Sequence, residues 1–594
     1  MITRLRPSSR LVLSGFFRLT AAFTACSGRK VQPADLVLLN GSVYTMADAR
    51  PRAAAVVVAE NKIVALYDND TEVKRHIGRR TRVIDLEGRM AVPGLIDSHV
   101  HFDRAGALIN DANLMTVSDE VSLRKEIGRV GEILEDGEWI TEGLWGAYEQ
   151  WALGAAGQAA SRGKPPWRPQ RGMIDDLTSR NPCFLCRFDG REWLANSAAL
   201  TASGLLDAPL EGMEKGPGGL PSGIVFSPSP AYDALARAMK PKSRNRLLDE
   251  NRAALKALRE AGIVEVHDIA TPEQTERFCE IQAQGGLTCR VWLRPDLSVG
   301  TELREQGIRM GDHPKTRRPD AWLRYGALKG YIDGIMGTHG ALFFEPYSDQ
   351  PGNYGHWRAH TSDDPEQKVR NMEKMYGLIR AGLAGGFVPN VHAIGDRGVA
   401  EMLDLYERIK NEMGIELKGF RVIHAQVVRP RDFARFKALG VIAEVNPYHI
   451  SDDMRWMEER IGRERCRGAY AFRSLIANGA TLCFGSDWPG TSAAYYQVHP
   501  RYLIYAAVAR KTLKGTPPEG WFPEQKLSIE EALRAYTVNG ARAAFEESLR
   551  GTLEPGKIAD ITVFDRDLFK VSEAEILEAE VDYTIVDGRV VFER

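Results

Sequence analysis

The chain has 594 residues, which is long enough for a large domain with a sizeable core and a smaller second domain. Its 78 basic and 79 acidic residues are well mixed and leave a formal net charge of −1. This balance offers no basic surface for nucleic acid or for an anionic membrane, so we expect a small-molecule substrate.

Residues 1–30 differ in kind from the rest of the chain. Three arginines precede an apolar stretch over 11–25, which ends in small residues and Cys26. The pattern is typical of an export signal and resembles a bacterial lipoprotein leader, in which Cys26 would carry a lipid anchor. Export would place the protein in the cell envelope, in the periplasm or outside the cell. The alternative, favoured by Arg18 within the apolar stretch, is a poorly ordered tail on a cytoplasmic protein.

Short strands are predicted on both sides of a long central region. Those before it cover residues 35–40, 54–58, 62–65 and 83–85, and those after it cover 561–564 and 581–591. Two such sets pair most economically with each other, so we expect residues 31–90 and 550–594 to form one composite β-sandwich. The alternative is two unrelated appendages.

The central region, residues 91–549, alternates between strand and helix patterns. Eight short apolar runs read as strands, at 91–101, 263–270, 288–296, 324–333, 387–396, 421–426, 441–447 and 481–489. Amphipathic helices are predicted between most of them, at 366–384, 399–414, 430–440 and 469–480, and a last one at 528–544. Alternation of this kind predicts parallel strands with right-handed crossovers, and eight such units close into a (β/α)₈ TIM barrel.

The first and second predicted strands are separated by residues 102–262. This interval is too long for a simple loop, so we expect an inserted subdomain. Loops that follow barrel strands build the active-site face. The insertion is therefore expected to roof the site and to shape its specificity.

Candidate metal ligands lie at the ends of four predicted strands. His99 and His101 end the first strand, and their spacing of two directs both side chains the same way. His392, His424 and Asp487 end the fifth, sixth and eighth strands, so four of the 12 histidines fall at such positions. Imidazole and carboxylate ligands suit zinc, with manganese or iron as alternatives, and one or two divalent ions are expected.

Lys329 on the fourth predicted strand alternates with its neighbours in a way that directs it toward the same interior. A protonated amine is a poor metal ligand. One interpretation is a lysine paired with a carboxylate such as Asp333. The other is a lysine carboxylated by CO₂, a carboxylysine, which would supply an oxygen to each of two metals.

Five further residues are candidate substrate contacts. His267 and Asp268 end the second strand, His339 follows the fourth, Asp333 ends the fourth and Trp488 follows the eighth. The alternative for His267, Asp268 and His339 is that they support the site, as when a residue such as Asp268 orients a ligand imidazole. The alternative for Trp488 is packing in the core.

The order of the candidate ligands resembles that of the amidohydrolase superfamily of metal-dependent hydrolases. Several stretches resemble its family 3 subgroup, which contains N-substituted formamide deformylase. They are residues 92–101, 196–200, 333–334, 391–396, 484–489 and 551–560. The resemblance runs from about Ala34 to Phe592.

This resemblance implies an enzyme that hydrolyses a C–N bond, such as that of an N-formyl or N-acyl amine, with a metal-activated hydroxide. It implies that His99, His101, Lys329, His392, His424 and Asp487 hold the metal. It also implies that Asp487 accepts the proton of the attacking water and passes it to the departing nitrogen. One alternative is that the same site hydrolyses a lactone, carbamate or phosphotriester. Others are decarboxylation or isomerisation at this site, or a metal-binding protein without activity. A homodimer is also left open.

Overall fold

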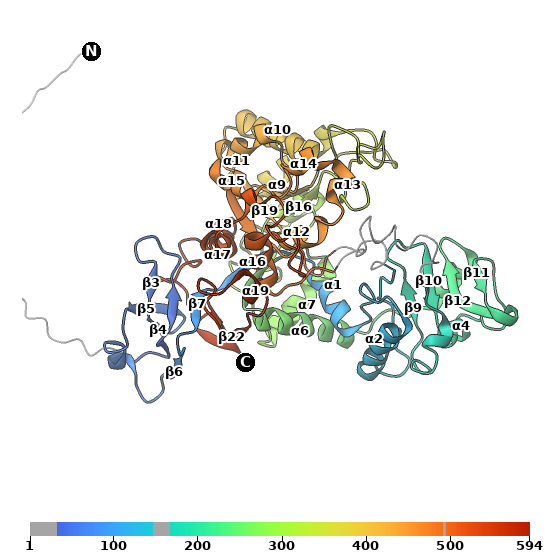
Figure 1. The fold of residues 1–594 in the computed structure, drawn as a ribbon, viewed down its shortest axis with the longest axis horizontal. Coiled ribbons are helices and arrows are strands. Elements are labelled where there is room, and N and C mark those ends of the chain that lie inside the picture. The colour runs from blue at the N-terminus through green and yellow to red at the C-terminus, as the bar shows by residue number, and fades with distance from the viewer. Residues whose placement is uncertain (1–32, 147–166, 491–494) are drawn as a thin grey trace, which may run out of the picture.

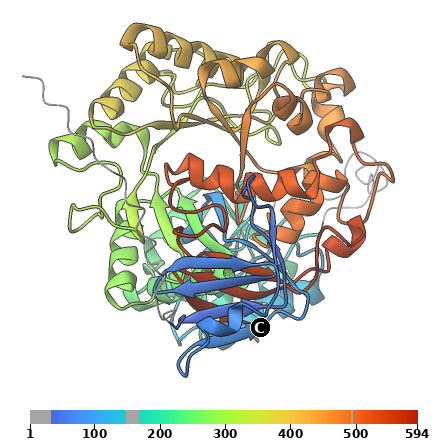
Figure 2. The same cartoon turned by 90° about the vertical axis from the view of Figure 1, so that its left-hand side faces the viewer.

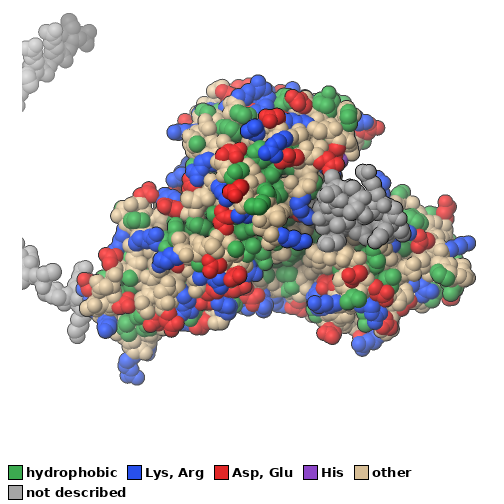
Figure 3. Space-filling model, viewed as in Figure 1, with side chains coloured by type: hydrophobic (Ala, Val, Ile, Leu, Met, Phe, Trp, Pro, Cys, Tyr) green, Lys and Arg blue, Asp and Glu red, His purple; other side chains and the backbone are tan. Residues whose placement is uncertain are grey.

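The structure is a computed structural model that describes residues 33–146, 167–490 and 495–594. The export signal and the lipid anchor expected within residues 1–30 lie outside the described residues. Among those that are described, no helix combines the length and the apolar character needed to cross a bilayer. Acidic and basic side chains are interspersed over the face shown in Figure 3.

The protein has a mixed α/β fold that contains two parallel sheets. One has the order β15-β14-β13-β8, with β8 Leu95–Val100, β13 Ile263–Asp268, β14 Arg290–Leu293 and β15 Leu323–Tyr325. The other has the order β16-β17-β18-β19-β20, with β16 Leu328–Tyr331, β17 Pro389–Ala393, β18 Arg421–His424, β19 Ile442–Val445 and β20 Thr481–Phe484. All eight predicted strands contain one of these elements.

The fourth predicted strand, 324–333, is split between the two sheets. Its first part, β15, pairs with β14, and its second part, β16, pairs with β17. Gly326 lies at the break, where a Cβ atom would come 2.2 Å from the ring of Trp292. The chain can pass this close to the indole only because glycine has no side chain.

Backbone hydrogen bonds also join the edges of the two sheets. The Lys329 amide donates to the carbonyl of Pro295 at 2.8 Å. At the other pair of edges the Asp487 amide donates to the carbonyl of His99, and the His101 amide donates to that of Trp488, both at 2.8 Å. The carboxyl end of β8 is thereby tied to the segment that follows β20.

Strands from the two ends of the chain pair with each other (Figure 2). A six-stranded sheet has the order β23-β22-β21-β7-β2-β3, with β2 Ser42–Tyr44, β3 Arg52–Ala53, β7 Met90–Pro93, β21 Ile561–Phe564, β22 Val581–Val586 and β23 Arg589–Glu593. A four-stranded sheet has the order β5-β4-β1-β6, with β1 Leu36–Leu39, β4 Ala55–Ala59, β5 Lys62–Tyr67 and β6 Arg82–Asp85. Leu38 and Val56 of the smaller sheet share one apolar core with Ile561 and Ile585 of the larger.

Part of the interval 102–262 forms a separate lobe, which lies at the opposite side of the molecule from β4 and β5 (Figure 1). It contains the sheet β11-β12-β10-β9, with β9 Phe184–Cys186, β10 Glu192–Ala195, β11 Met213–Lys215 and β12 Pro221–Phe226. Its helices are α2 Glu120–Ile133, α4 Ser197–Ala202 and α5 Pro230–Ala238. The helices at either end of the interval, α1 Phe102–Asn110 and α6 Arg244–Glu260, instead contribute Phe102 and Leu255 to the main core. The lobe is therefore smaller than the expected insertion.

The remaining helices are α7 Pro272–Ala283, α8 Gly300–Glu305, α9 Met372–Ala384, α10 Asp396–Met413, α11 Phe433–Leu439, α12 Tyr448–Asp453, α13 Met457–Ile461, α14 Arg463–Cys466, α15 Phe472–Ala477, α16 Pro500–Ala509, α17 Ile529–Tyr536, α18 Val538–Ala543 and α19 Glu573–Ile576. The helix predicted over 399–414 is α10, which ends where Gly414 takes a φ of 62°. The helix predicted over 528–544 is two helices, because Thr537 between them has non-helical dihedral angles.

A buried ion pair ties the C-terminal segment to the parallel sheets. Arg290 of β14 donates to Asp560 at 2.6 Å, and both residues are buried. Replacing Asp560 with Ala would leave a buried guanidinium without its main partner, so Asp560→Ala should lower the free energy of unfolding by about 3–5 kcal/mol. The measurement is the midpoint of thermal or denaturant unfolding.

The matched control is Glu593→Ala. This substitution removes an exposed ion pair between Glu593 of β23 and Arg82 of β6. This variant should unfold at nearly the wild-type midpoint. Equal effects of the two substitutions would contradict a special role for the buried pair.

Candidate metal centre

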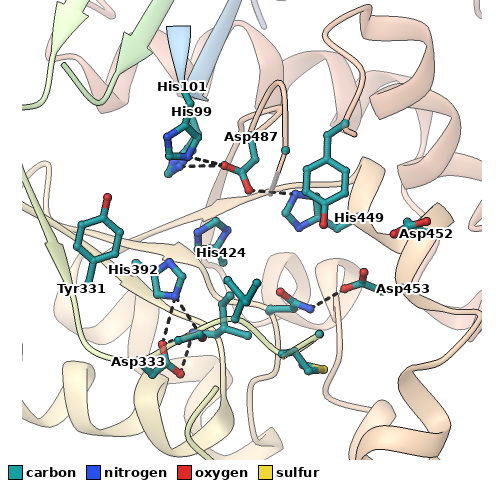
Figure 4. A pocket seen from close by; sticks show the side chains of 18 of the residues that line it. His99, His101, Tyr331, Asp333, His392, His424, His449, Asp452, Asp453 and Asp487 are labelled. Atoms are coloured by element: carbon teal, nitrogen blue, oxygen red, sulfur yellow. Dashed lines mark hydrogen bonds and ion pairs between the residues drawn. The ribbon is translucent and has the colours of Figure 1, made fainter. Parts of the chain in front are cut away.

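All six predicted ligands line one cavity of about 240 Å³ (Figure 4). They are His99, His101, Lys329, His392, His424 and Asp487. They lie in or next to the carboxyl-terminal parts of β8, β16, β17, β18 and β20, which meet on one side of the parallel sheets. Residues up to 388 positions apart in the chain thus share one site.

Asp487 lies at the centre of this group. Its Oδ1 is 3.1 Å from Nε2 of His101 and 3.3 Å from Nε2 of His99, and its Oδ2 is 3.4 Å from Nε2 of His449. Burial raises the pKa of this carboxyl, but hydrogen bonds with the three imidazoles outweigh burial and hold the pKa well below its usual value. Asp487 is therefore an ionised carboxylate surrounded by nitrogen atoms.

Two groups of side chains could each hold a cation. In each group, one ligand atom per residue lies within 4.8 Å of the others. The first group is His99, His101 and Asp487, and the second is His424, His449 and Asp487. Imidazole nitrogens with a carboxylate oxygen are a donor set that suits zinc and similar divalent ions. The residues present therefore fit one or two metal ions, with Asp487 common to both groups.

His392 belongs to the same cavity but to neither group of ligand atoms. Its ring centroid is 4.5 Å from that of His424. Its Nε2, however, faces the carbonyl of Gly334 at 3.5 Å and Oδ1 of Asp333 at 3.4 Å. In this structure the imidazole packs beside the ligand groups and points away from them.

Lys329 has a buried amine without a hydrogen-bond partner among the described residues. Its Nζ is buried, makes no hydrogen bond within the described residues, and lies 4.7 Å from the ring centroid of Tyr331. Burial, followed by the nearby Arg294, lowers the pKa of Lys329 well below its usual value. An uncharged amine in this position could act as a ligand or react with CO₂.

Asp333 is not the partner of Lys329, so that one of the two interpretations of Lys329 is wrong for Asp333. Its oxygens accept hydrogen bonds from the backbone amides of Leu342, Ile394 and Gly395, at 2.9, 3.1 and 2.9 Å. Burial raises the pKa of Asp333 to about 7. Asp333 lines the cavity, but its carboxylate holds the loop after β16 against the end of β17.

Two side chains in and directly after β19, Glu444 and Asn446, orient two of the histidines. This role was not identified from the sequence. Oε1 of Glu444 is 2.7 Å from Nδ1 of His99, and Oδ1 of Asn446 is 2.7 Å from Nδ1 of His424. Donation from Nδ1 leaves Nε2 of each imidazole free to face the cavity. The signal was the spacing of two between Glu444 and Asn446 on a predicted strand, which places both side chains on one face.

The cavity walls come mainly from the segments that follow β16 and β19. His449 of α12, Asp453 and Trp456 follow β19, whereas Met336 and Arg358 follow β16. His449 could have been found from its position just beyond a strand end. Of the described residues within 102–262, only Arg104 of α1 lines the cavity, so the described part of the insertion does not form the expected roof.

His267 and Asp268 do not line the cavity, which corrects their expected role as substrate contacts. His267 is fully buried between Glu265, at 3.1 Å from Nε2, and Arg421, at 2.9 Å from Nδ1. Burial lowers the pKa of His267 to about 3. Asp268 accepts a hydrogen bond from the amide of Phe102 at 2.9 Å, at the start of α1. Both side chains hold structural elements together.

His339 and Trp488 are likewise absent from the described cavity lining. Nε2 of His339 bonds to Asp349 at 2.9 Å. Trp488 is 1% exposed and packs into the main core. His339 therefore makes a loop contact in place of the suggested substrate contact, and Trp488 has the packing role that was its alternative.

Comparisons with known proteins find similar sequences along most of the chain. The model of the amidohydrolase family matches residues 82–592. Protein LONG AFTER FAR-RED 3 of Arabidopsis thaliana is 30% identical over 94% of this chain and 92% of its own. N-substituted formamide deformylase of Arthrobacter pascens is 25% identical over 95% of this chain and 99% of its own.

A solved structure is similar over nearly the whole fold. It is an uncharacterised metal-dependent hydrolase from Pyrococcus furiosus, 25% identical, with a TM-score of 0.67 over 90% of this chain and all of its own. The family match covers most of the chain, and the Arabidopsis relative is similar along nearly all of it. This chain therefore belongs to the amidohydrolase family.

Proposed function

We propose that this amidohydrolase cleaves an amide-type C–N bond, such as that of an N-formyl or N-acyl amine. The observation that carries the proposal is the position of Asp487, an ionised carboxylate shared by two groups of candidate ligands inside one cavity. The similarity to N-substituted formamide deformylase along nearly the full length of both chains supports the choice of bond.

We also infer that the two parallel sheets are two arcs of one (β/α)₈ barrel. The backbone bonds between Lys329 and Pro295 and between His101 and Trp488 support closure at both pairs of edges. The shared core of the two sheets built from the chain ends supports one composite β-sandwich of residues 31–90 and 550–594.

A divalent ion, with zinc preferred to manganese or iron, would lower the pKa of a water molecule and polarise the substrate carbonyl. Burial lowers the pKa of His99 to about 4 and holds that of His424 well below its usual value, which favours the neutral imidazoles that can bind a cation. Burial lowers the pKa of His392 in the same direction. Asp487 takes up the proton of the attacking water and returns it to the departing nitrogen. The lowered pKa keeps the carboxylate of Asp487 ionised before the water attacks.

Lys329 decides how many ions the site holds. Its amine makes no hydrogen bond within the described residues, and its lowered pKa favours the neutral form. The neutral amine adds CO₂, with a new N–C bond and loss of one proton, to give a carbamate. A carboxylated Lys329 would offer an oxygen to each of two ions. An unmodified lysine would leave a site for one.

Metal analysis followed by a substrate screen tests the proposed function. The purified protein should contain one or two equivalents of a divalent metal, and a chelator should abolish amine release from N-formyl and N-acyl amines. Lactones, carbamates and phosphotriesters serve as comparison substrates. Full activity without metal, or faster turnover of a comparison substrate, would reject the proposal.

Replacing Asp487 with Asn tests its role in proton transfer. The amide keeps the shape of the side chain but cannot take up the proton, so Asp487→Asn should lower kcat by about 10²–10⁴-fold. Metal content, measured in parallel, shows whether the loss arises in catalysis or in ligation. Near-normal turnover would reject the assignment.

Asn446 should control metal affinity through the orientation of His424. Asn446→Leu removes the acceptor for Nδ1 and should weaken metal binding by about 10–100-fold in competition with a chelator. Asn446→Asp keeps an acceptor oxygen and should restore most of the affinity. If both variants bind metal equally, Asn446 does not orient His424.

A further inference from the structure

Arg358 brings to the cavity wall a positive charge that no acidic side chain of the described residues pairs. It lines the cavity and follows β16, and no carboxylate forms an ion pair with it within the described residues. Its described side-chain contact is with the ring of Tyr331, 5.5 Å from the guanidinium carbon to the ring centroid. A guanidinium that faces a binding cavity without an acidic partner is suited to an anionic group on a ligand.

The four carboxylates that line the cavity all interact with groups other than Arg358. Asp487 is surrounded by three imidazoles, and Asp333 by three backbone amides. Asp453 accepts hydrogen bonds from Gln426, at 2.8 Å, and from Tyr470. Asp452 forms an ion pair with Arg455. None of these carboxylates neutralises Arg358.

Arg358 is also held in place close to the candidate metal centre. Its amide donates to the carbonyl of Ile332 at 3.0 Å, which fixes the start of the side chain. The ring of Tyr331 supports the guanidinium and is itself stacked on His360, with 6.0 Å between centroids and an angle of 9°. Nζ of Lys329 lies over the same ring, 4.7 Å from its centroid. Arg358 and the predicted ligand Lys329 therefore both contact the ring of Tyr331.

Other parts of the lining are apolar or aromatic. Ile335 and Met336 follow β16, and Trp456 and Tyr496 come from the segments after β19 and β20. Such walls suit an apolar body on the substrate. The cavity thus places the guanidinium of Arg358 beside apolar and aromatic side chains. Arg104 also lines the cavity, but its guanidinium donates to the carbonyl of Gly490 at 2.9 Å.

We infer that Arg358 binds a carboxylate of the substrate, so that the preferred substrates are amides that carry a carboxylate a few atoms from the C–N bond, as N-acyl amino acids do. One planar guanidinium matches one carboxylate through two parallel hydrogen bonds. A phosphate dianion would leave a second charge without a partner. The inference rests on the proposed hydrolysis of C–N bonds.

The test compares two substrates that differ only in the carboxylate. N-formylphenylalanine, as both enantiomers, is compared with N-formylphenethylamine on the metal-replete, full-length protein. The wild type should favour one enantiomer of the acid in kcat/KM by about 10–100-fold, the range expected of a charge-assisted hydrogen-bonding pair. Arg358→Gln should abolish this preference, mainly through KM, and leave turnover of the neutral amide within about threefold.

Arg380→Gln is the matched control. Arg380 is an exposed arginine that also lies 5.5 Å from a tyrosine ring, that of Tyr376, but on α9 and outside the described cavity lining. This variant should keep the wild-type preference. A general effect of removing an arginine from a tyrosine face would appear in both variants.

Three results would overturn the inference: a wild type without preference for the acid, an Arg358→Gln variant that keeps the preference, or equal losses for both substrates. If neither compound is hydrolysed by the metal-loaded protein, the proposed function fails for this class of amides. Calorimetric binding of the acid then decides the inference separately. Binding that is lost in Arg358→Gln supports it, and absent or unchanged binding rejects it.

Discussion

The arrangement of the site depends on one buried carboxylate, that of Glu444 on β19. It accepts hydrogen bonds from His99 at 2.7 Å, from Arg294 at 3.0 Å and from Arg421 at 2.9 Å, and all four side chains are at most 1% exposed. Charges buried this deeply are tolerated only where each has close partners. His99, Arg421 and Glu444 come from β8, β18 and β19, and Arg294 directly follows β14. Pairing these charges therefore also fixes the relative positions of four strands and the direction in which His99 faces.

The same network reaches the C-terminal segment. Arg421 contacts His267, His267 bonds to Glu265, and Arg550 donates to Glu265 at 2.8 Å. Arg550 is fully buried although it follows the last helices of the parallel-sheet region. Paired charges are thus buried between the parallel sheets. They connect Glu444, which orients His99, to Arg550 in the segment before β21.

Chemistry and specificity come from different parts of the chain. The candidate ligands lie at strand ends, where the surrounding sheet holds them rigidly, and two of them adopt left-handed backbone angles, His424 with a φ of 71° and Asp487 with a φ of 57°. Such angles are unfavourable for non-glycine residues and recur at functional sites. The described walls come mainly from segments after β16, β19 and β20 and from α1, and His449 of α12 is both a wall residue and a candidate ligand. We expect changes elsewhere in these walls to alter substrate choice.

Local pattern was enough to predict the parallel strands and the residues at their carboxyl ends, because strand periodicity and parallel pairing bring such residues to one side of a sheet whatever the rest of the fold. It could not predict partners. Lys329 does not pair with Asp333, which was one of its two interpretations, and His267 is directed into a buried network. His449 and Glu444 join the centre without a motif. Those outcomes depend on packing between segments that are far apart in the chain, which only the tertiary structure decides.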